Sequence, residues 1–254
     1  MNTMQTLTIK NIVVGEGRPK ICVPIIGKTK EEILTTALDV MDHSPDLLEW
    51  RVDFYEEVEN LESVKNLLEN LATIADEVPI IFTFRSKVEG GEREISSTYY
   101  KELNQEIAKT GFAELIDVEL FQEKAEELVK EIHRFDTKVI MSNHDFHKTP
   151  DEEELLFRLE KMNLLGADIA KIAVMPTSLK DVLRLLSVTE EANTCGISCP
   201  IVTMSMSEKG LISRLAGEIF GSVMTFGTVG KISAPGQIPI EELLAVLDVV
   251  HKYK

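Results

Sequence analysis

The segment Gly166-Ala-Asp-Ile-Ala-Lys-Ile-Ala-Val-Met175 decides the fold. A run of Ile, Val and Ala of this kind is typical of a β-strand buried on both faces, as in a parallel sheet covered by helices. Lys171 interrupts the run, and lysine is almost never buried without a partner. Burial disfavours the charged ammonium, and a neutral amine is a nucleophile that attacks ketones to form a Schiff base. The alternative interpretation is a lysine at a strand end whose charged head reaches water.

Seven further apolar runs recur along the chain, and segments with helical periodicity separate most of them. Strands are expected over Lys20–Ile26, Leu47–Asp53, Pro79–Arg85, Ala113–Glu119, Lys138–Asn143, Asp168–Met175, Pro200–Ser205 and Ser222–Gly227. Helices are expected over Lys30–His43, Glu62–Ala75, Lys124–His133, Asp151–Leu165, Leu179–Ala192, Lys209–Phe220 and Pro239–Val250. Strands that alternate with helices predict a parallel sheet, and eight such strands close a (β/α)8 TIM barrel. We therefore predict an α/β fold of this type, formed by residues 1–254 as a single domain.

A short β-hairpin is expected over residues 5–18, ahead of the first barrel strand. The apolar stretch Leu7–Val14 is followed there by Gly-Glu-Gly. The alternative architecture is a doubly wound open sheet. No Gly-x-Gly-x-x-Gly sequence follows an early strand, so the dinucleotide-binding form of that fold is not indicated.

The chain carries 43 acidic and 27 basic residues, which gives a net charge of −16. Nucleic acids and anionic membranes bind basic surfaces, so neither is expected as a partner. An anionic metabolite can still bind through a few well-placed arginines. The three cysteines (Cys22, Cys195 and Cys199) form no disulfide or zinc pattern, and no signal peptide or membrane-spanning run is recognisable. We expect a cytoplasmic protein.

Polar residues follow the apolar part of most of the expected strands. In this type of barrel the chemistry takes place at the carboxyl ends of the strands, so these residues are candidates for one site. They are Glu49, Arg51, Asp53, Arg85, Asp117, Glu119, Asn143 and His144, and they join Lys171. Glu49 and Arg51 share one face of their strand, which fits either substrate binding or a structural ion pair.

His144 is a candidate general acid or base, because the pKa of histidine lies near neutrality. Together with His147 it is alternatively a metal ligand, although strand and loop spacing fix two histidines less well than a helix does. The stretch Gly227–Gly236 has the glycines and the length of a loop that closes over a site. Its alternative interpretation is a phosphate-binding loop after the eighth strand.

The segment Asp117-Val-Glu-Leu120, followed after eighteen residues by Val139-Ile-Met-Ser-Asn-His-Asp145, resembles the signature of type I 3-dehydroquinate dehydratases. Further matches to that family are Glu49-Trp-Arg51, Thr83-Phe-Arg-Ser86, Glu89-Gly-Gly91, Lys171-Ile-Ala173, Met204-Ser-Met206, Arg214 and Ser233-Ala-Pro-Gly-Gln237. The resemblance extends from the first expected strand to the last expected helix. It departs at Pro24, where members of the family often carry a small polar residue, and this leaves a minor contact from that strand open.

The resemblance implies a hydro-lyase that converts 3-dehydroquinate to 3-dehydroshikimate, in the shikimate pathway of aromatic amino acid biosynthesis, with no metal and no organic cofactor. It implies that Lys171 forms a Schiff base with the C3 ketone. His144 would remove a proton from C2 and protonate the departing C1 hydroxyl, and Glu89 would orient His144. Members of the family are commonly dimers, so a homodimer is expected.

The resemblance also implies how the substrate is held. Arg214 would bind its carboxylate, for which a planar guanidinium is well suited, and Ser233 and Gln237 would close over it. The full set of expected substrate-binding residues is Glu49, Arg51, Arg85, Met204, Met206, Arg214, Phe226, Ser233, Ala234 and Gln237.

Three other functions fit parts of the pattern. A class I aldolase would use the same lysine chemistry but would require a phosphate pocket with several backbone donors. A metal-dependent hydrolase would use His144 and His147. A non-catalytic barrel would bind a metabolite or a partner protein, and the joint presence of Glu89, His144 and Lys171 argues against it.

Overall fold

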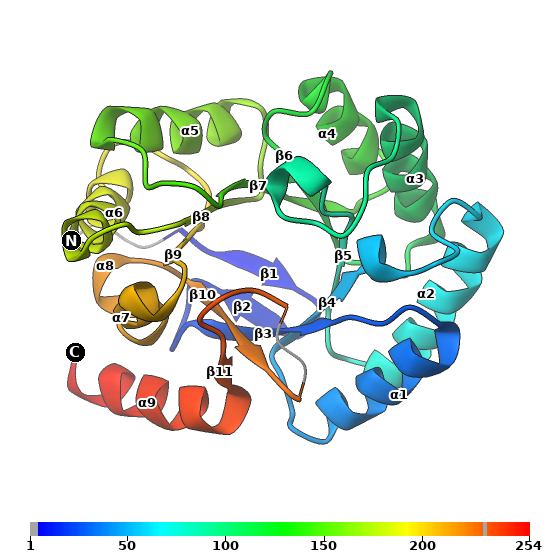
Figure 1. Ribbon diagram of the computed structural model, residues 1–254, viewed down its shortest axis with the longest axis horizontal. Coiled ribbons are helices and arrows are strands. Elements are labelled where there is room, and N and C mark those ends of the chain that lie inside the picture. The colour runs from blue at the N-terminus through cyan, green and yellow to red at the C-terminus, as the bar shows by residue number, and fades with distance from the viewer. Residues whose placement is uncertain (1–4, 231–232) are drawn as a thin grey trace.

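The computed structural model describes residues 5–230 and 233–254. Its eight principal strands run parallel and curl into a ring surrounded by helices (Figure 1). They are β3 (Lys20–Ile25), β4 (Leu47–Arg51), β5 (Ile80–Thr83), β6 (Leu115–Glu119), β7 (Lys138–Asp145), β8 (Ile169–Val174), β9 (Ile201–Ser205) and β10 (Met224–Thr228). The two ends of the sheet meet where Ile201 of β9 pairs with Ser222, just ahead of β10. The predicted α/β fold is confirmed, and the two-residue strand β11 (Ile238–Pro239) extends the sheet beyond β10.

The helices cover the outer face of the sheet. They are α1 (Lys30–Met41), α2 (Leu61–Ala75), α3 (Ser97–Thr110), α4 (Ala125–His133), α5 (Glu152–Leu164), α6 (Leu179–Ala192), α7 (Leu211–Leu215), α8 (Gly217–Phe220) and α9 (Ile240–Tyr253). Thr29, Asn60, Ser96 and Asp151 precede four of them, and each side chain accepts a hydrogen bond from a backbone N–H of the first turn.

The helices differ from the prediction in two places. Helix α3 is not predicted, because the polar Asn104 interrupts its buried face and donates to the Tyr100 carbonyl. Two features of the sequence could have indicated this helix: Ser96, which caps its start, and Gly111, which ends it in a left-handed conformation. The single helix predicted over Lys209–Phe220 is instead a short 3-10 turn followed by α7 and α8, with the break at Ala216.

The predicted N-terminal hairpin is confirmed as β1 (Leu7–Ile9) paired antiparallel with β2 (Ile12–Val14). Its buried residues Ile9 and Val14 pack with inward-facing side chains from the first half of the barrel strands. Those side chains are Cys22, Leu47, Ile81, Leu115, Ile140, Ile169, Val202 and Met224. One end of the barrel interior is therefore apolar and closed by the hairpin.

The inward-facing positions become polar toward the carboxyl ends of the strands. Two residues after the apolar layer, β4, β6 and β8 present Glu49, Asp117 and Lys171, all of which are buried. Because strand side chains alternate with a period of two, the same strands that form the apolar core also bring these charged groups together.

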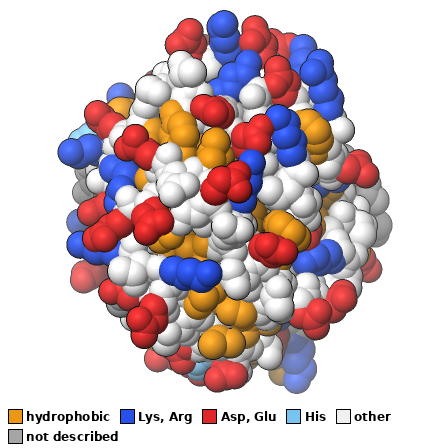
Figure 2. Space-filling model, turned by 90° about the vertical axis from the view of Figure 1, so that its right-hand side faces the viewer, with side chains coloured by type: hydrophobic (Ala, Val, Ile, Leu, Met, Phe, Trp, Pro, Cys, Tyr) orange, Lys and Arg blue, Asp and Glu red, His pale blue; other side chains and the backbone are white. Residues whose placement is uncertain are grey.

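On the outer surface, acidic and basic side chains are interspersed over the face seen in Figure 2. Among the described residues, no helix combines the length and apolar character required to cross a bilayer.

Replacing a side chain of the apolar layer is expected to destabilise the whole barrel. Leu115 is fully buried in that layer, so Leu115→Ala should lower the free energy of unfolding by about 2–5 kcal/mol. Leu164→Ala is the matched control, because Leu164 is 82% exposed at the end of α5, and its effect should stay within about 0.5 kcal/mol. Urea titration of both variants measures the difference, and equal losses would contradict the assignment of the core.

Candidate active site

A pocket opens at the carboxyl ends of the barrel strands, with about 570 Å³ of space including its mouth. All thirteen side chains predicted for the site, three catalytic and ten substrate-binding, line it. Gly90, Phe146 and Ala173 line it as well and were not predicted. Phe146 follows His144 by two residues and its ring packs against the α-carbon of Gly90, so the two loops that carry His144 and Glu89 touch. That contact is between distant segments, and no local sequence signal marks it.

Lys171 extends from β8 into the pocket and is only 4% exposed, so the interpretation in which its head reaches water is wrong. Its Nζ lies 3.5 Å from Oε1 of Glu49 and 3.7 Å from Oδ2 of Asp117. The Phe226 ring lies beneath it, with its centroid 4.2 Å from Nζ. Two carboxylates and an aromatic face all stabilise a positive charge. The Lys171 amine therefore lies among groups that attract a cation, with carboxylate oxygens 3.5 and 3.7 Å away.

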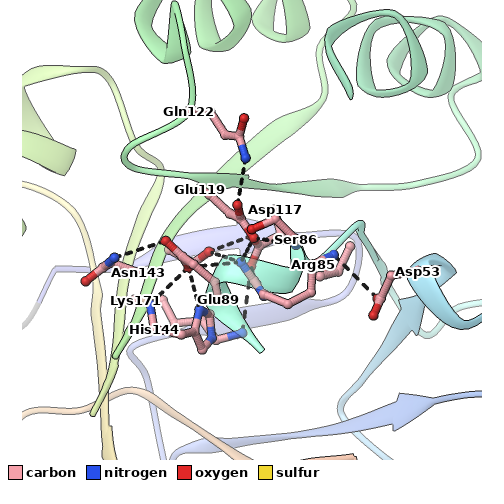
Figure 3. A network of polar contacts seen from close by, with 12 residues as sticks. Asp53, Arg85, Ser86, Glu89, Asp117, Glu119, Gln122, Asn143, His144 and Lys171 are labelled. Atoms are coloured by element: carbon pink, nitrogen blue, oxygen red, sulfur yellow. Dashed lines mark hydrogen bonds and ion pairs between the residues drawn. The ribbon is translucent and has the colours of Figure 1, made fainter. Parts of the chain in front are cut away.

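Arg85 occupies the centre of a buried carboxylate cluster (Figure 3). Its two terminal nitrogens donate to Asp117 at 2.7 Å and to Glu119 at 3.0 Å, and Glu89 lies at 3.5 Å. The hydroxyl of Ser142 also accepts from Arg85, at 2.9 Å. Burial acts to lower the pKa of Arg85, but the surrounding carboxylates outweigh it and raise that pKa well above its ordinary value. This guanidinium is a permanent cation that allows three acids to share one small volume.

Glu89 and His144 form a pair on the wall of the pocket (Figure 3). The Glu89 Oε2 atom lies 3.0 Å from His144 Nδ1 and also accepts from the backbone N–H of His144. The side chain of Asn143 donates to the other Glu89 oxygen. With Nδ1 engaged in this way, the second ring nitrogen of His144 is left for chemistry.

The surroundings shift the pKa values of both members of this pair. Burial lowers the pKa of His144 well below its ordinary value, and the cations Arg85, Lys171 and Arg51 lower it further. The imidazole is therefore neutral near pH 7 and able to accept a proton. Burial also raises the pKa of Glu89 to about 8, with Arg85 opposing the rise and Glu119 adding to it.

The structural ion-pair interpretation requires Arg51 to pair with Glu49. Arg51 pairs instead with Asp53. The two side chains form a bidentate pair with distances of 2.8 and 2.9 Å. Asp53 also accepts from the backbone N–H groups of Arg85 and Glu92, so it ties Arg51 to the loop that carries Glu89. Glu49 remains beside Lys171.

Arg214 of α7 differs from the other arginines of the pocket because no described carboxylate pairs with it. It is 2% exposed. One terminal nitrogen contacts the Met204 sulfur, the other donates to the Pro235 carbonyl at 3.1 Å, and Nε has no partner among the described residues. Burial lowers the pKa of Arg214 to about 10. A buried cation without a counter-ion at the pocket wall is suited to binding an anion.

Three residues of the segment Ser233–Gln237 line the pocket, and hydrogen bonds within the segment hold them together. Oε1 of Gln237 accepts from the backbone N–H groups of Ser233 and Ala234, and Nε2 of Gln237 donates to the Ser233 hydroxyl. Residues 231 and 232 of the predicted loop Gly227–Gly236 lie outside the described residues.

His147 is exposed and does not line the pocket, so it does not join His144 as the metal-site interpretation requires. Within residues 5–230 and 233–254, no group of three His, Cys, Asp or Glu side chains is arranged to hold a metal ion.

The fold is a parallel α/β barrel, and one pocket of it contains a buried lysine, a neutral histidine and an arginine with no described carboxylate partner. These features are those of a barrel enzyme. The model of the family described as type I 3-dehydroquinase matches residues 21–254. The chain is 55% identical over 246 residues to the 3-dehydroquinate dehydratase of Clostridioides difficile, covering 96% of each chain. The chain belongs to the type I 3-dehydroquinase family.

Two solved structures agree with this assignment. The type I 3-dehydroquinate dehydratase of Clostridium difficile, solved with covalent modified comenic acid, superposes with a TM-score of 0.95 at 53% identity, covering 99% of this chain and 100% of that one. The 3-dehydroquinate dehydratase of Geobacillus kaustophilus superposes with a TM-score of 0.97 at 38% identity, covering both chains completely.

The raised pKa of Glu89 predicts a pH dependence of stability. From pH 4.5 to about 8 the folded chain retains a proton on Glu89 that the unfolded chain has lost, so the free energy of unfolding falls as the pH rises. The comparison is made above pH 6.5, because below that value the lowered pKa of His144 also makes the free energy of unfolding depend on pH. Between pH 6.5 and 8, the wild type should lose on the order of 1–2 kcal/mol relative to Glu89→Gln.

Denaturant titrations across this pH range measure the difference. Glu94→Gln is the matched control, because Glu94 lies in the same loop but is exposed, and it should retain the wild-type slope. Parallel slopes for the wild type and Glu89→Gln would show that Glu89 is ionised throughout the range.

Proposed function

We propose that the chain is a hydro-lyase that converts 3-dehydroquinate to 3-dehydroshikimate through an imine on Lys171, as a step of the shikimate pathway of aromatic amino acid biosynthesis. The observation that carries the proposal is the placement of the Lys171 amine in one pocket with His144 and Arg214. Membership of the type I 3-dehydroquinase family supports the substrate, and the relative solved with covalent modified comenic acid supports a covalent step.

Arg214 binds the substrate carboxylate in this proposal. Its guanidinium is buried and its Nε lacks a partner in the part of the chain that the structure describes, whereas Arg51 and Arg85 are engaged by carboxylates of the protein. A carboxylate that accepts two hydrogen bonds from a guanidinium is fixed in orientation as well as in position. The ring hydroxyls of the substrate then face Glu49, Arg51 and Arg85.

Lys171 then forms the imine with the C3 ketone. The hydroxyl on C1 lies β to that ketone, and it leaves only if the carbanion formed at C2 is stabilised. A protonated imine accepts the electron pair better than a ketone does, so the covalent step lowers the barrier to proton removal. The imine is hydrolysed after dehydration, which releases the product.

His144 performs the two proton transfers of the elimination. Its neutral imidazole removes the proton from C2, and the resulting imidazolium gives that proton to the departing C1 hydroxyl. Glu89 fixes the orientation of the ring through Nδ1. Ser233 and Gln237 lie over the pocket and exclude water, which would otherwise compete for these protons.

The cytoplasmic location and the homodimer stay predictions. The aldolase interpretation is less well supported, because the anion-binding group of the pocket is a guanidinium rather than a set of backbone N–H donors.

Removing the amine should abolish turnover. We expect Lys171→Met to lower kcat by on the order of 10³-fold or more, because no other lysine among the described residues lines the pocket, while substrate binding measured by calorimetry persists. Lys180→Met, in an exposed position on α6, is the matched control and should retain the wild-type rate. Turnover by Lys171→Met at a comparable rate would remove the imine from the mechanism.

Removing the imidazole should separate imine formation from elimination. In His144→Ala, borohydride should still trap 3-dehydroquinate on the protein, whereas kcat falls by about 10²–10⁴-fold because the proton carrier is missing. Mass spectrometry of the trapped chain and a steady-state assay give the two values. A variant that turns over like the wild type would assign the proton transfers to another group.

A further inference from the structure

The loop that joins β9 to α7 contains a strained residue to which the proposed mechanism assigns no task. Ser207 has φ 60° and ψ 179°, a backbone region that residues other than glycine rarely adopt. Such a conformation persists only where the surrounding structure fixes it, and strained residues of this kind cluster at functional sites. Ser207 does not line the pocket, so a task in the reaction has to be performed through another residue.

The chain is fixed on both sides of Ser207. Before it, the Met206 N–H donates to a carbonyl of β8 at 2.8 Å. After it, the Gly210 N–H donates to the Ser207 carbonyl at 3.1 Å. The Ser213 hydroxyl accepts from the Ser205 N–H and donates to the Gly210 carbonyl, which ties the start of α7 to the end of β9. Because both flanks are held, the change of direction falls on Ser207, and its positive φ provides the turn.

This turn presents the Ser207 N–H to the segment Ser233–Gln237. The N–H donates to the Pro235 carbonyl at 3.3 Å, and the same carbonyl accepts from Nη2 of Arg214 at 3.1 Å. Gly236 follows at φ 81°, so close to Ser207 that a β-carbon on Gly236 would lie 2.8 Å from the Ser207 carbonyl oxygen. One carbonyl therefore rests on the strained loop and holds the buried arginine of the pocket.

We propose that Ser207 is a positioning residue for Arg214 and that it acts through the Pro235 carbonyl. The inference rests on the proposed function, in which Arg214 binds the substrate carboxylate. Among the described residues, this carbonyl is the only oxygen that Arg214 bonds, and its other contact is the Met204 sulfur, a weak acceptor. A guanidinium binds a carboxylate through two parallel hydrogen bonds only when its plane is aligned. The carbonyl that Ser207 fixes sets that plane.

The backbone of Ser207 performs this role. In the described structure, its hydrogen bonds to Pro235 and Gly210 are formed by its N–H and its carbonyl. Removal of the hydroxyl should therefore be tolerated. Glycine adopts the same φ without strain, whereas a β-branched side chain at positive φ is strongly disfavoured. A valine at this position should consequently turn the N–H away from Pro235.

The test compares steady-state kinetics of full-length variants with 3-dehydroquinate as substrate. In Ser207→Val we expect kcat/KM to fall on the order of 10-fold, mainly through KM, because the arginine contacts substrate and transition state alike. Ser207→Ala and Ser207→Gly should stay within about twofold of the wild type, because they retain the backbone contact. Ser187→Val, exposed on α6, is the matched control for the substitution.

A double variant decides whether the effect passes through Arg214. In an Arg214→Met background, Ser207→Val should change kcat/KM by less than about twofold, because the guanidinium that it positions is absent. Gly236→Ala disturbs the same contact from the other side, since its β-carbon would meet the Ser207 carbonyl. It should reproduce the loss seen in Ser207→Val and replaces that variant if Ser207→Val does not fold.

The remaining outcomes contradict the proposal. A wild-type kcat/KM in Ser207→Val and Gly236→Ala would show that the contact positions nothing. A loss of the same size in the Arg214→Met background would mean that Ser207 acts on another part of the pocket. A loss in Ser207→Ala equal to that in Ser207→Val would assign the effect to the hydroxyl. Absence of turnover of 3-dehydroquinate by the wild type would instead refute the proposed function.

Discussion

The structure depends on the burial of Arg85 among carboxylates. Asp117 contacts one of its terminal nitrogens, and Glu119 and Glu89 both contact the other. Without this cation, three acids in so small a volume would repel one another more strongly, and even with it burial raises the pKa of Glu89 to about 8. With it, each acid is free to hold a second group. Asp117 helps to hold Lys171, Glu89 holds His144, and Glu119 accepts from the Ser86 backbone at the start of the Glu89 loop.

This arrangement surrounds the amine and the imidazole with charges of different sign. Lys171 lies beside two carboxylates and over an aromatic ring. His144 lies among cations and is buried, which keeps its ring neutral. In the proposed reaction, the protons of the amine leave as water during imine formation, and the neutral imidazole is the base that elimination requires. One barrel mouth can support both steps because the acids are placed nearer to the lysine and the cations act on the histidine.

Much of this was predictable from the sequence, because both the strand period and the spacing of polar residues are local. The eight strands and the thirteen pocket residues are found where the pattern of apolar runs and the family resemblance indicate. The partners within the site were not predictable in the same way. The pairing of Arg51 with Asp53 rather than Glu49 and the packing of Phe146 on Gly90 depend on how strands and loops meet in space. Helix α3 escaped prediction because the buried polar residue Asn104, whose side-chain N–H donates within the helix, interrupts the apolar stripe.

The central claim is that Lys171 forms the covalent bond to the substrate. The most direct measurement is borohydride reduction of the protein in the presence of 3-dehydroquinate, followed by proteolysis and mass mapping of the modified peptide. The account predicts a single adduct, on the peptide that contains Lys171. An adduct on a different lysine, or turnover without any reducible adduct, would contradict it.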